Sequence, residues 1–325
     1  MQAKLTYTRE ADFRRERDFG AKVGATFEFV MAQFRPLFKC LLYFVLPGAL
    51  LAGIGMGLFL SNMLSMIPIT GRSGHGGRIS MLGNSSFLGM GMATVGFLAA
   101  FLLLSSTVYA FVRVRISTPP QEVVQPAQVW AFVWKRLGRV VAAWLVLSLL
   151  MLAGMGVLMG GLALIGPGFM FLIVFPAFWV VVCLTLYSPI IWLEDEGILA
   201  SLRRSFYLIK GKWWSSLGLY MIMSFITGIV NYLFMIPFYG LMVARTMLKL
   251  PGFDSGILSV AATSIYALGW IFTAVLPLVA MLFQYFNLVE RKDGIGLRQL
   301  VDSLGQTPAP HVSNSTYRPD DEGEY

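Results

Sequence analysis

Few side chains in this sequence are suited to catalysis or to metal binding. Its two histidines, His75 and His311, lie in a Gly-rich stretch and in a Pro- and acid-rich tail, and neither is near a cysteine or paired carboxylates in the sequence. Cys40 and Cys183 lie in apolar runs, where a free cysteine behaves as a small hydrophobic residue. None of the four has the spacing of a metal site. The sequence therefore predicts no catalytic residue, no metal site and no bound cofactor.

One acidic run, Glu194-Asp195-Glu196, allows two interpretations. Three carboxylates in a row can hold a divalent cation. The alternative is a cluster of negative charge just before a helix that begins near Ile198, where the positive end of the helix dipole favours it. The second interpretation is the one we expect.

The composition indicates whether this chain folds in water or in a lipid bilayer. Hydrophobic residues make up 57% of the 325 residues and charged residues only 13%, with a mean hydropathy of +0.70. A soluble domain has about 25% charged residues, so a soluble globule is excluded, and two cysteines are too few for a disulfide scaffold. An integral membrane protein remains. Long uncharged runs without strand-like alternation indicate helices rather than a barrel.

The uncharged runs predict an all-α membrane bundle of six transmembrane helices. The turn residues Gly166-Pro167-Gly168 divide the longest run into two crossings, and Pro237 is expected to end or kink the fifth span. The predicted spans are 38–60, 88–112, 140–165, 169–192, 214–237 and 258–286. The predicted division is an N-terminal segment (1–25), a membrane domain (26–302) and a disordered tail (303–325), with a mobile loop over 61–87.

Charge is distributed unevenly along this pattern. All but four of the 25 Lys and Arg residues flank the spans on one side; the four are Arg72, Arg78, Arg245 and Lys249. By the positive-inside rule both termini are cytoplasmic. The net charge of +8 is then explained by this orientation and by contact with anionic lipid. No nucleic-acid partner is therefore predicted.

Apart from Lys39 at the start of the first, the predicted spans contain no Asp, Glu, Lys, Arg or His. Asn231, Gln284 and, just past the last span, Asn287 are the few strongly polar residues. Ion-coupled transport usually needs charged groups at depth, so a coupled transporter is disfavoured.

Three segments look like repeats of one unit. Amphipathic stretches at 27–38, 129–141 and 198–213 each run into a span, with basic residues opposite an apolar stripe. This pattern predicts three interfacial amphipathic helices, each followed by a hairpin of two spans, as parallel repeats. Small residues also recur at four-residue spacing, which is typical of close helix packing: Gly53 with Gly57, Gly89 with Ala93, and Gly156 with Gly160.

One of these stretches resembles a known family. Residues 200–214, Ala-Ser-Leu-Arg-Arg-Ser-Phe-Tyr-Leu-Ile-Lys-Gly-Lys-Trp-Trp, resemble a signature of the bacterial membrane domain linked to glycerophosphoryl diester phosphodiesterases and of related six-span families. Residues 17–20, 25–29 and 288–294 look like the Bacteroidetes members. The resemblance implies six spans, a location in the bacterial inner membrane and no established activity. The catalytic barrel fused to some relatives needs clustered histidines and carboxylates, which this sequence lacks.

The same signature supplies the predicted site. Arg204, Lys210 and Lys212 next to Trp213 and Trp214 predict a contact with lipid phosphate at headgroup depth, the alternative being ordinary anchoring of a helix. We expect a non-enzymatic membrane protein, namely a scaffold, an accessory subunit or a lipid-interacting module. The alternatives are a permease or exporter of a small or lipidic solute and, third, an intramembrane enzyme. A protein partner or a homo-oligomer stays open.

Overall fold

The computed structural model describes residues 7–65, 84–165, 170–248, 250, 252–253, 255–296, 298 and 301. Every regular element in these residues is a helix, as the composition predicts. His75, His311, the loop residues 66–83 and the predicted tail at 303–325 fall outside the described residues.

The helices range in length from 4 residues in the first to 40 in the sixth. In chain order they are α1 (Glu10–Phe13), α2 (Phe19–Ala32), α3 (Phe34–Phe44), α4 (Leu46–Ser65), α5 (Asn84–Ser117), α6 (Pro126–Ile165), α7 (Met170–Leu184), α8 (Tyr187–Leu193), α9 (Ile198–Ile209), α10 (Trp213–Thr246) and α11 (Gly256–Asp293).

The prediction of six membrane helices is confirmed. The helical segments long and apolar enough to cross a membrane are Leu46–Met63, Ser86–Ser117, Pro126–Gly161, Pro176–Leu193, Trp213–Arg245 and Gly256–Asp293. The chain is therefore a multi-pass membrane protein.

Several predicted span limits differ from those of the structure, among them the start of the first span and the end of the fifth. The first span begins at Leu46 rather than at 38, because a break at Val45 separates α3 from α4. Pro47 explains the break, since it has no N–H to donate to the preceding turn and its ring crowds the carbonyl of Tyr43, four residues before it. The fifth span does not end at Pro237; α10 runs through this proline to Thr246.

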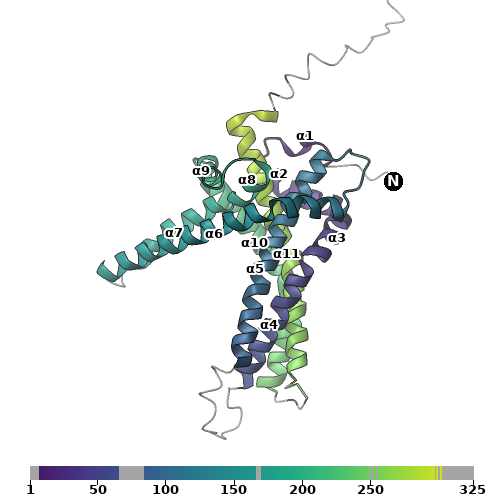
Figure 1. Ribbon diagram of the computed structural model, residues 1–325, viewed down its shortest axis with the longest axis vertical. Coiled ribbons are helices and arrows are strands. Elements are labelled where there is room, and N and C mark those ends of the chain that lie inside the picture. Colours follow the sequence, from purple (N-terminus) through teal and green to yellow (C-terminus); the bar gives the residue numbers. More distant parts are fainter. Residues whose placement is uncertain are drawn as a thin grey trace, which may run out of the picture.

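Four helices, α4, α5, α10 and α11, lie side by side as a bundle (Figure 1). Glycines let α4 and α5 pack almost backbone to backbone. A Cβ placed on Gly55 would lie 2.3 Å from the backbone nitrogen of Ala93, and one on Gly96 would lie 2.3 Å from that of Ala52. A second face of α4 packs on α11, where the Thr263 hydroxyl donates a hydrogen bond of 2.8 Å to the carbonyl oxygen of Gly53.

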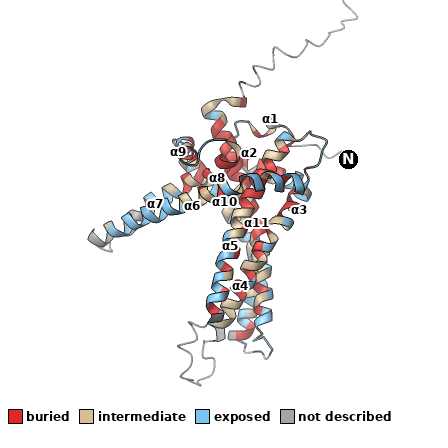
Figure 2. Cartoon of the chain, viewed as in Figure 1, coloured by how far each residue is buried: buried red, intermediate tan, exposed pale blue. Residues whose placement is uncertain are grey.

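Only some of the predicted small-residue pairs lie at a helix–helix interface. Gly53 and Gly57 face α11, and Gly89 faces α4. Gly156 and Gly160 face nothing within 4 Å. These two glycines lie on α6, which together with α7 forms an arm that leaves the bundle sideways (Figure 1). Most of the described side chains of the arm are exposed (Figure 2).

The predicted amphipathic stretches adopt three different forms. The first is divided between α2 and α3, the second is continuous with the apolar part of α6, and the third is the separate helix α9. The last form corrects the expectation that each stretch runs into its span without a loop. Each stretch precedes a pair of apolar segments: α4 and α5, then the rest of α6 with α7–α8, then α10 and α11.

The protein core lies at the end of the bundle that carries the N-terminal segment (Figure 2). Phe13 of α1 is fully buried against Phe29 of α2 and against Phe283 and Phe286 of α11. The predicted domain limit at residue 25 falls inside α2. Large buried aromatic side chains gather where the short helices surround the ends of the long ones, so this end is held by protein–protein packing.

Candidate lipid-headgroup site

A basic hollow lies where the α9–α10 turn meets the last turns of α11 and the N-terminal segment. It encloses about 470 Å³ and is lined by Glu16, Lys210, Gly211, Lys212, Leu288, Arg291 and Lys292. Four basic side chains therefore face one carboxylate. We refer to these seven residues as the basic hollow.

A tight turn presents two of the lysines. The turn follows the last residue of α9, and the Lys212 N–H donates a hydrogen bond of 2.9 Å to the Ile209 carbonyl. Gly211 takes φ of +85°, a left-handed conformation that favours glycine. Lys210 and Lys212 on either side of it are exposed. Within the described residues neither lysine forms an ion pair, so both ammonium groups are available to an anion.

The α11 side of the hollow is more tightly held. Arg291 Nε lies 3.3 Å from Glu16 Oε2. The Lys292 ammonium donates to the carbonyl oxygens of Tyr207 and Lys210, and lies 4.3 Å from the centre of the Tyr207 ring. These contacts fix the positions of two positive charges opposite the turn.

A fifth basic residue lies close to the hollow. Lys22 of α2 is only 3% exposed, and its ammonium donates hydrogen bonds to Gln284 Oε1 at 2.8 Å and to Ser215 Oγ at 3.2 Å. Burial lowers the pKa of Lys22, and the nearby positive charges of Arg291 and Lys212 lower it further. Gln284, one of the few polar residues in its predicted span, therefore accepts a hydrogen bond from this buried lysine.

The two predicted tryptophans lie beside the turn at the start of α10. Trp214 is 78% exposed. Trp213 packs edge-on against it, with ring centres 4.7 Å apart, and its indole N–H donates to the Trp179 carbonyl oxygen of α7 at 3.3 Å. An exposed indole next to basic residues is typical of the membrane–water interface.

Arg204, the remaining predicted site residue, does not line the basic hollow. Its Nε lies 3.2 Å from Glu194 Oε2, and its guanidinium also pairs with Asp293. Burial alone would lower the pKa of Arg204, but the hydrogen bond to Asp293 and the charge of Glu194 raise it above its ordinary value. The Tyr285 hydroxyl donates to Glu194 Oε1 at 2.9 Å and completes the cluster. The guanidinium thus joins α9 to α11, whereas the sequence predicts that it contacts lipid.

The acidic run before α9 also serves internal ion pairs. Asp195 lies 2.5 Å from Arg136 of α6 and 3.6 Å from Arg113 of α5. The hydrogen bond from Arg136 lowers the pKa of Asp195. In the part of the chain that the structure describes, no three His, Cys, Asp or Glu side chains are grouped as metal ligands would be.

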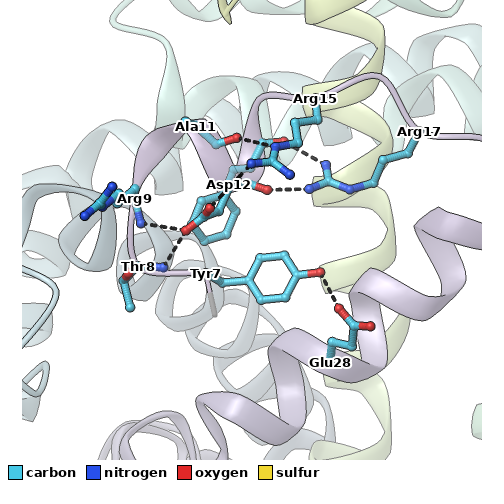
Figure 3. A network of polar contacts seen from close by, with 9 residues as sticks. Tyr7, Thr8, Arg9, Ala11, Asp12, Arg15, Arg17 and Glu28 are labelled. Atoms are coloured by element: carbon cyan, nitrogen blue, oxygen red, sulfur yellow. Dashed lines mark hydrogen bonds and ion pairs between the residues drawn. The ribbon is translucent and has the colours of Figure 1, made fainter. Parts of the chain in front are cut away.

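Sequence reasoning missed the folded N-terminal segment that supplies Glu16. The Tyr7 hydroxyl donates to Glu28 at 2.9 Å, and Asp12 Oδ2 accepts the backbone N–H groups of Thr8 and Arg9 (Figure 3). The backbone N–H of Arg17 donates to the side-chain oxygen of Asn287 on α11 at 2.8 Å. The signal in the sequence is an aromatic residue at every sixth position, namely 7, 13 and 19, within a charged stretch.

Comparison with protein-family models, with curated proteins and with solved structures finds no match to this chain.

Proposed function

We propose that this chain is a non-enzymatic, lipid-interacting module of the bacterial inner membrane that binds anionic phospholipid headgroups at the basic hollow. The observation that supports this most directly is four basic side chains around one carboxylate, directly beside the exposed Trp214. Each basic residue close to an anionic surface contributes about 1 kcal/mol to the attraction. A phosphate can contact Lys210 and Lys212 without displacing an existing ion pair.

Both termini are proposed to be cytoplasmic. The basic hollow, the N-terminal segment and the end of α11 lie at the same end of the bundle, and the positive-inside rule assigns that end to the cytoplasm. The anionic leaflet surface would then face the hollow. The inner-membrane location rests on the resemblance of residues 200–214 to the phosphodiesterase-linked membrane domain.

The experiment compares two double variants that each remove two positive charges. Lys210→Gln with Lys212→Gln changes the basic hollow, whereas Lys135→Gln with Arg203→Gln changes exposed basic residues of α6 and α9 outside it. Each protein is purified from native membranes in mild detergent, bound phospholipid is weighed by native mass spectrometry, and affinity for phosphatidylglycerol is titrated in nanodiscs. We expect the hollow variant to bind about thirtyfold more weakly, from about 2 kcal/mol for two lysines, and the control to behave as wild type.

Equal lipid retention by the two double variants would remove the proposal. Competition by millimolar inorganic phosphate, with no preference for lipid, would assign the hollow to a soluble anion instead. Arg204 is left unchanged in this test because its substitution would disturb the α9–α11 ion pairs.

The second candidate is a permease or exporter of a small or lipidic solute. The observation in its favour is that Pro237 and Pro277 lie inside long membrane helices, where a proline kinks the helix and frees a backbone carbonyl. Uptake of a labelled solute into proteoliposomes in proportion to protein would support this candidate over the first.

A further inference from the structure

A second cavity, separate from the basic hollow, lies where the α6–α7 arm leaves the bundle. It encloses about 480 Å³ and is lined by residues of α5, α6, α7, α8, α10 and α11. Its volume is within the range of about 300–1,000 Å³ usual for sites that bind small molecules. Tyr220 at its rim is 40% exposed, so the cavity opens on the side of α10.

The lining of this cavity is mostly apolar and carries a set of neutral polar groups, but it contains no acid, no basic residue and no histidine among its described residues. It includes the hydroxyl groups of Tyr220, Ser224, Thr227 and Tyr266 and the carboxamide of Asn231. Such groups bind a neutral molecule that has hydrogen-bond donors and acceptors of its own. An ionised headgroup would find no opposite charge here and would lose its hydration.

One polar atom of the lining has no partner. The Asn231 side-chain oxygen is buried and makes no hydrogen bond with any described residue. The neighbouring hydroxyl of Thr227, in contrast, donates at 3.4 Å to the carbonyl oxygen of Thr273. That carbonyl lacks its helical partner because Pro277, four residues later, has no N–H. An unpaired acceptor inside a membrane protein is costly, so a ligand donor opposite Asn231 would be favourable.

The cavity lies at the depth of the hydrocarbon. Tyr220 and Asn231 follow Trp214 by 6 and 17 residues, which places them about 9 and about 26 Å along α10 from that interfacial indole. Because the cavity opens beside Tyr220 on the side of α10, a ligand that enters there comes from the lipid phase and is itself lipidic.

Two apolar grooves adjoin the cavity. One encloses about 360 Å³ between α6, α7 and α9 and shares Leu184 with the cavity. The other encloses about 550 Å³ along α4, α5 and α11 and shares Tyr266 and Trp270. A small neutral polar site with an apolar groove on each side matches a lipid that has two acyl chains.

We propose that this cavity binds a neutral diacyl lipid with a free hydroxyl group, of the diacylglycerol class. The Asn231 side chain turns its oxygen into the cavity and accepts from the lipid hydroxyl, the ester carbonyls accept from tyrosine or serine hydroxyls of the lining, and one chain occupies each groove. This site differs from the basic hollow in charge, in depth and in the headgroup it selects. A result that disproves one of these two sites therefore does not disprove the other.

The test uses the full-length protein in detergent and a diacylglycerol with a photoreactive acyl chain. Crosslinked peptides are mapped by mass spectrometry, and unlabelled diacylglycerol, triacylglycerol and phosphatidic acid are added as competitors. We expect crosslinks on the helices that line the two grooves, namely α6, α7 and α9 or α4, α5 and α11, with competition by diacylglycerol alone. Triacylglycerol lacks the hydroxyl donor and phosphatidic acid carries a charge.

Two variants with a matched control test the polar contacts. Asn231→Leu removes the unpaired acceptor, and Tyr220→Phe removes a hydroxyl at the rim; Tyr232→Phe removes a hydroxyl from the next residue of α10, which is 65% exposed and does not line the cavity. We expect Asn231→Leu to weaken diacylglycerol binding about fivefold to tenfold and Tyr232→Phe to leave it unchanged.

Three results would overturn the proposal. They are crosslinks spread evenly over the lipid-facing surface, equal competition by triacylglycerol, and equal affinity of wild type and a correctly folded Asn231→Leu. If that variant does not fold, the competition series on the wild type still decides the question.

Discussion

Replacing Gly55 by alanine should separate α4 from α5. The new Cβ would lie 2.3 Å from the Ala93 backbone nitrogen and 2.7 Å from the Gly89 carbonyl oxygen, neither of which is a flexible side-chain atom. Reaching 3.4 Å, the start of ordinary contact, requires a shift of about 1.1 Å. Overpacking of this kind costs about 1–3 kcal/mol, partly offset by a gain of about 0.5–1 kcal/mol in helix propensity. The net loss is about 0–2.5 kcal/mol, with a midpoint of about 1 kcal/mol.

Gly91 of α5 supplies the control. It has nothing within 4 Å of an added Cβ, so Gly91→Ala should gain only the propensity contribution. The propensity gain is common to both variants, so they should differ by the overpacking cost of about 1–3 kcal/mol in the free energy of unfolding. We would measure unfolding by thermal scanning in one detergent, where Gly55→Ala should unfold at a lower temperature than wild type and Gly91→Ala should not. Equal unfolding temperatures for the two variants would refute the close packing of α4 on α5.

Three further outcomes are expected. Burial and the hydrogen bond to Glu28 raise the pKa of Tyr7 to about 12. The contribution of Tyr7 to stability is therefore complete below pH 10 and is lost as the pH rises towards 12. In a series of unfolding temperatures measured against pH, Tyr7→Phe should lose less stability than wild type between pH 10 and pH 12. Phe13→Ala deletes a fully buried ring, a loss of about 3–5 kcal/mol for such a site, and should release the N-terminal segment so that trypsin cleaves after Arg15 or Arg17 faster than in wild type. Arg204→Gln should cost about 1–3 kcal/mol in thermal unfolding, and Arg204→Lys should not restore it because an ammonium lacks the fork that reaches both Glu194 and Asp293.

The sequence predicts the six membrane helices well because a bilayer restricts each crossing in length and charge at once. An uncharged run long enough to cross is visible without knowing what it packs against. Helix ends depend on local chemistry and are partly readable: Gly294, with φ of +62°, ends α11. Pro237 shows the limit of that reading, since α10 continues through it.

The candidate site is only partly predictable, because partners come from distant parts of the chain. The lysines and tryptophans of the α9–α10 turn are neighbours in sequence and lie together in space. Arg204 instead binds Asp293, which is 89 residues away, and no local pattern announces that pairing. In the same way, Gly53 and Gly156 look alike in the sequence, yet only Gly53 has a helix against it.

The length of α6 has a geometric consequence. Its 40 residues extend about 60 Å, roughly twice the thickness of a hydrocarbon layer. A helix longer than the hydrocarbon layer tilts or extends beyond it, and its tilt depends on the thickness of that layer. Arg136, in the N-terminal part of α6, pairs with Asp195. A change in bilayer thickness that alters the tilt of α6 therefore acts directly on this ion pair.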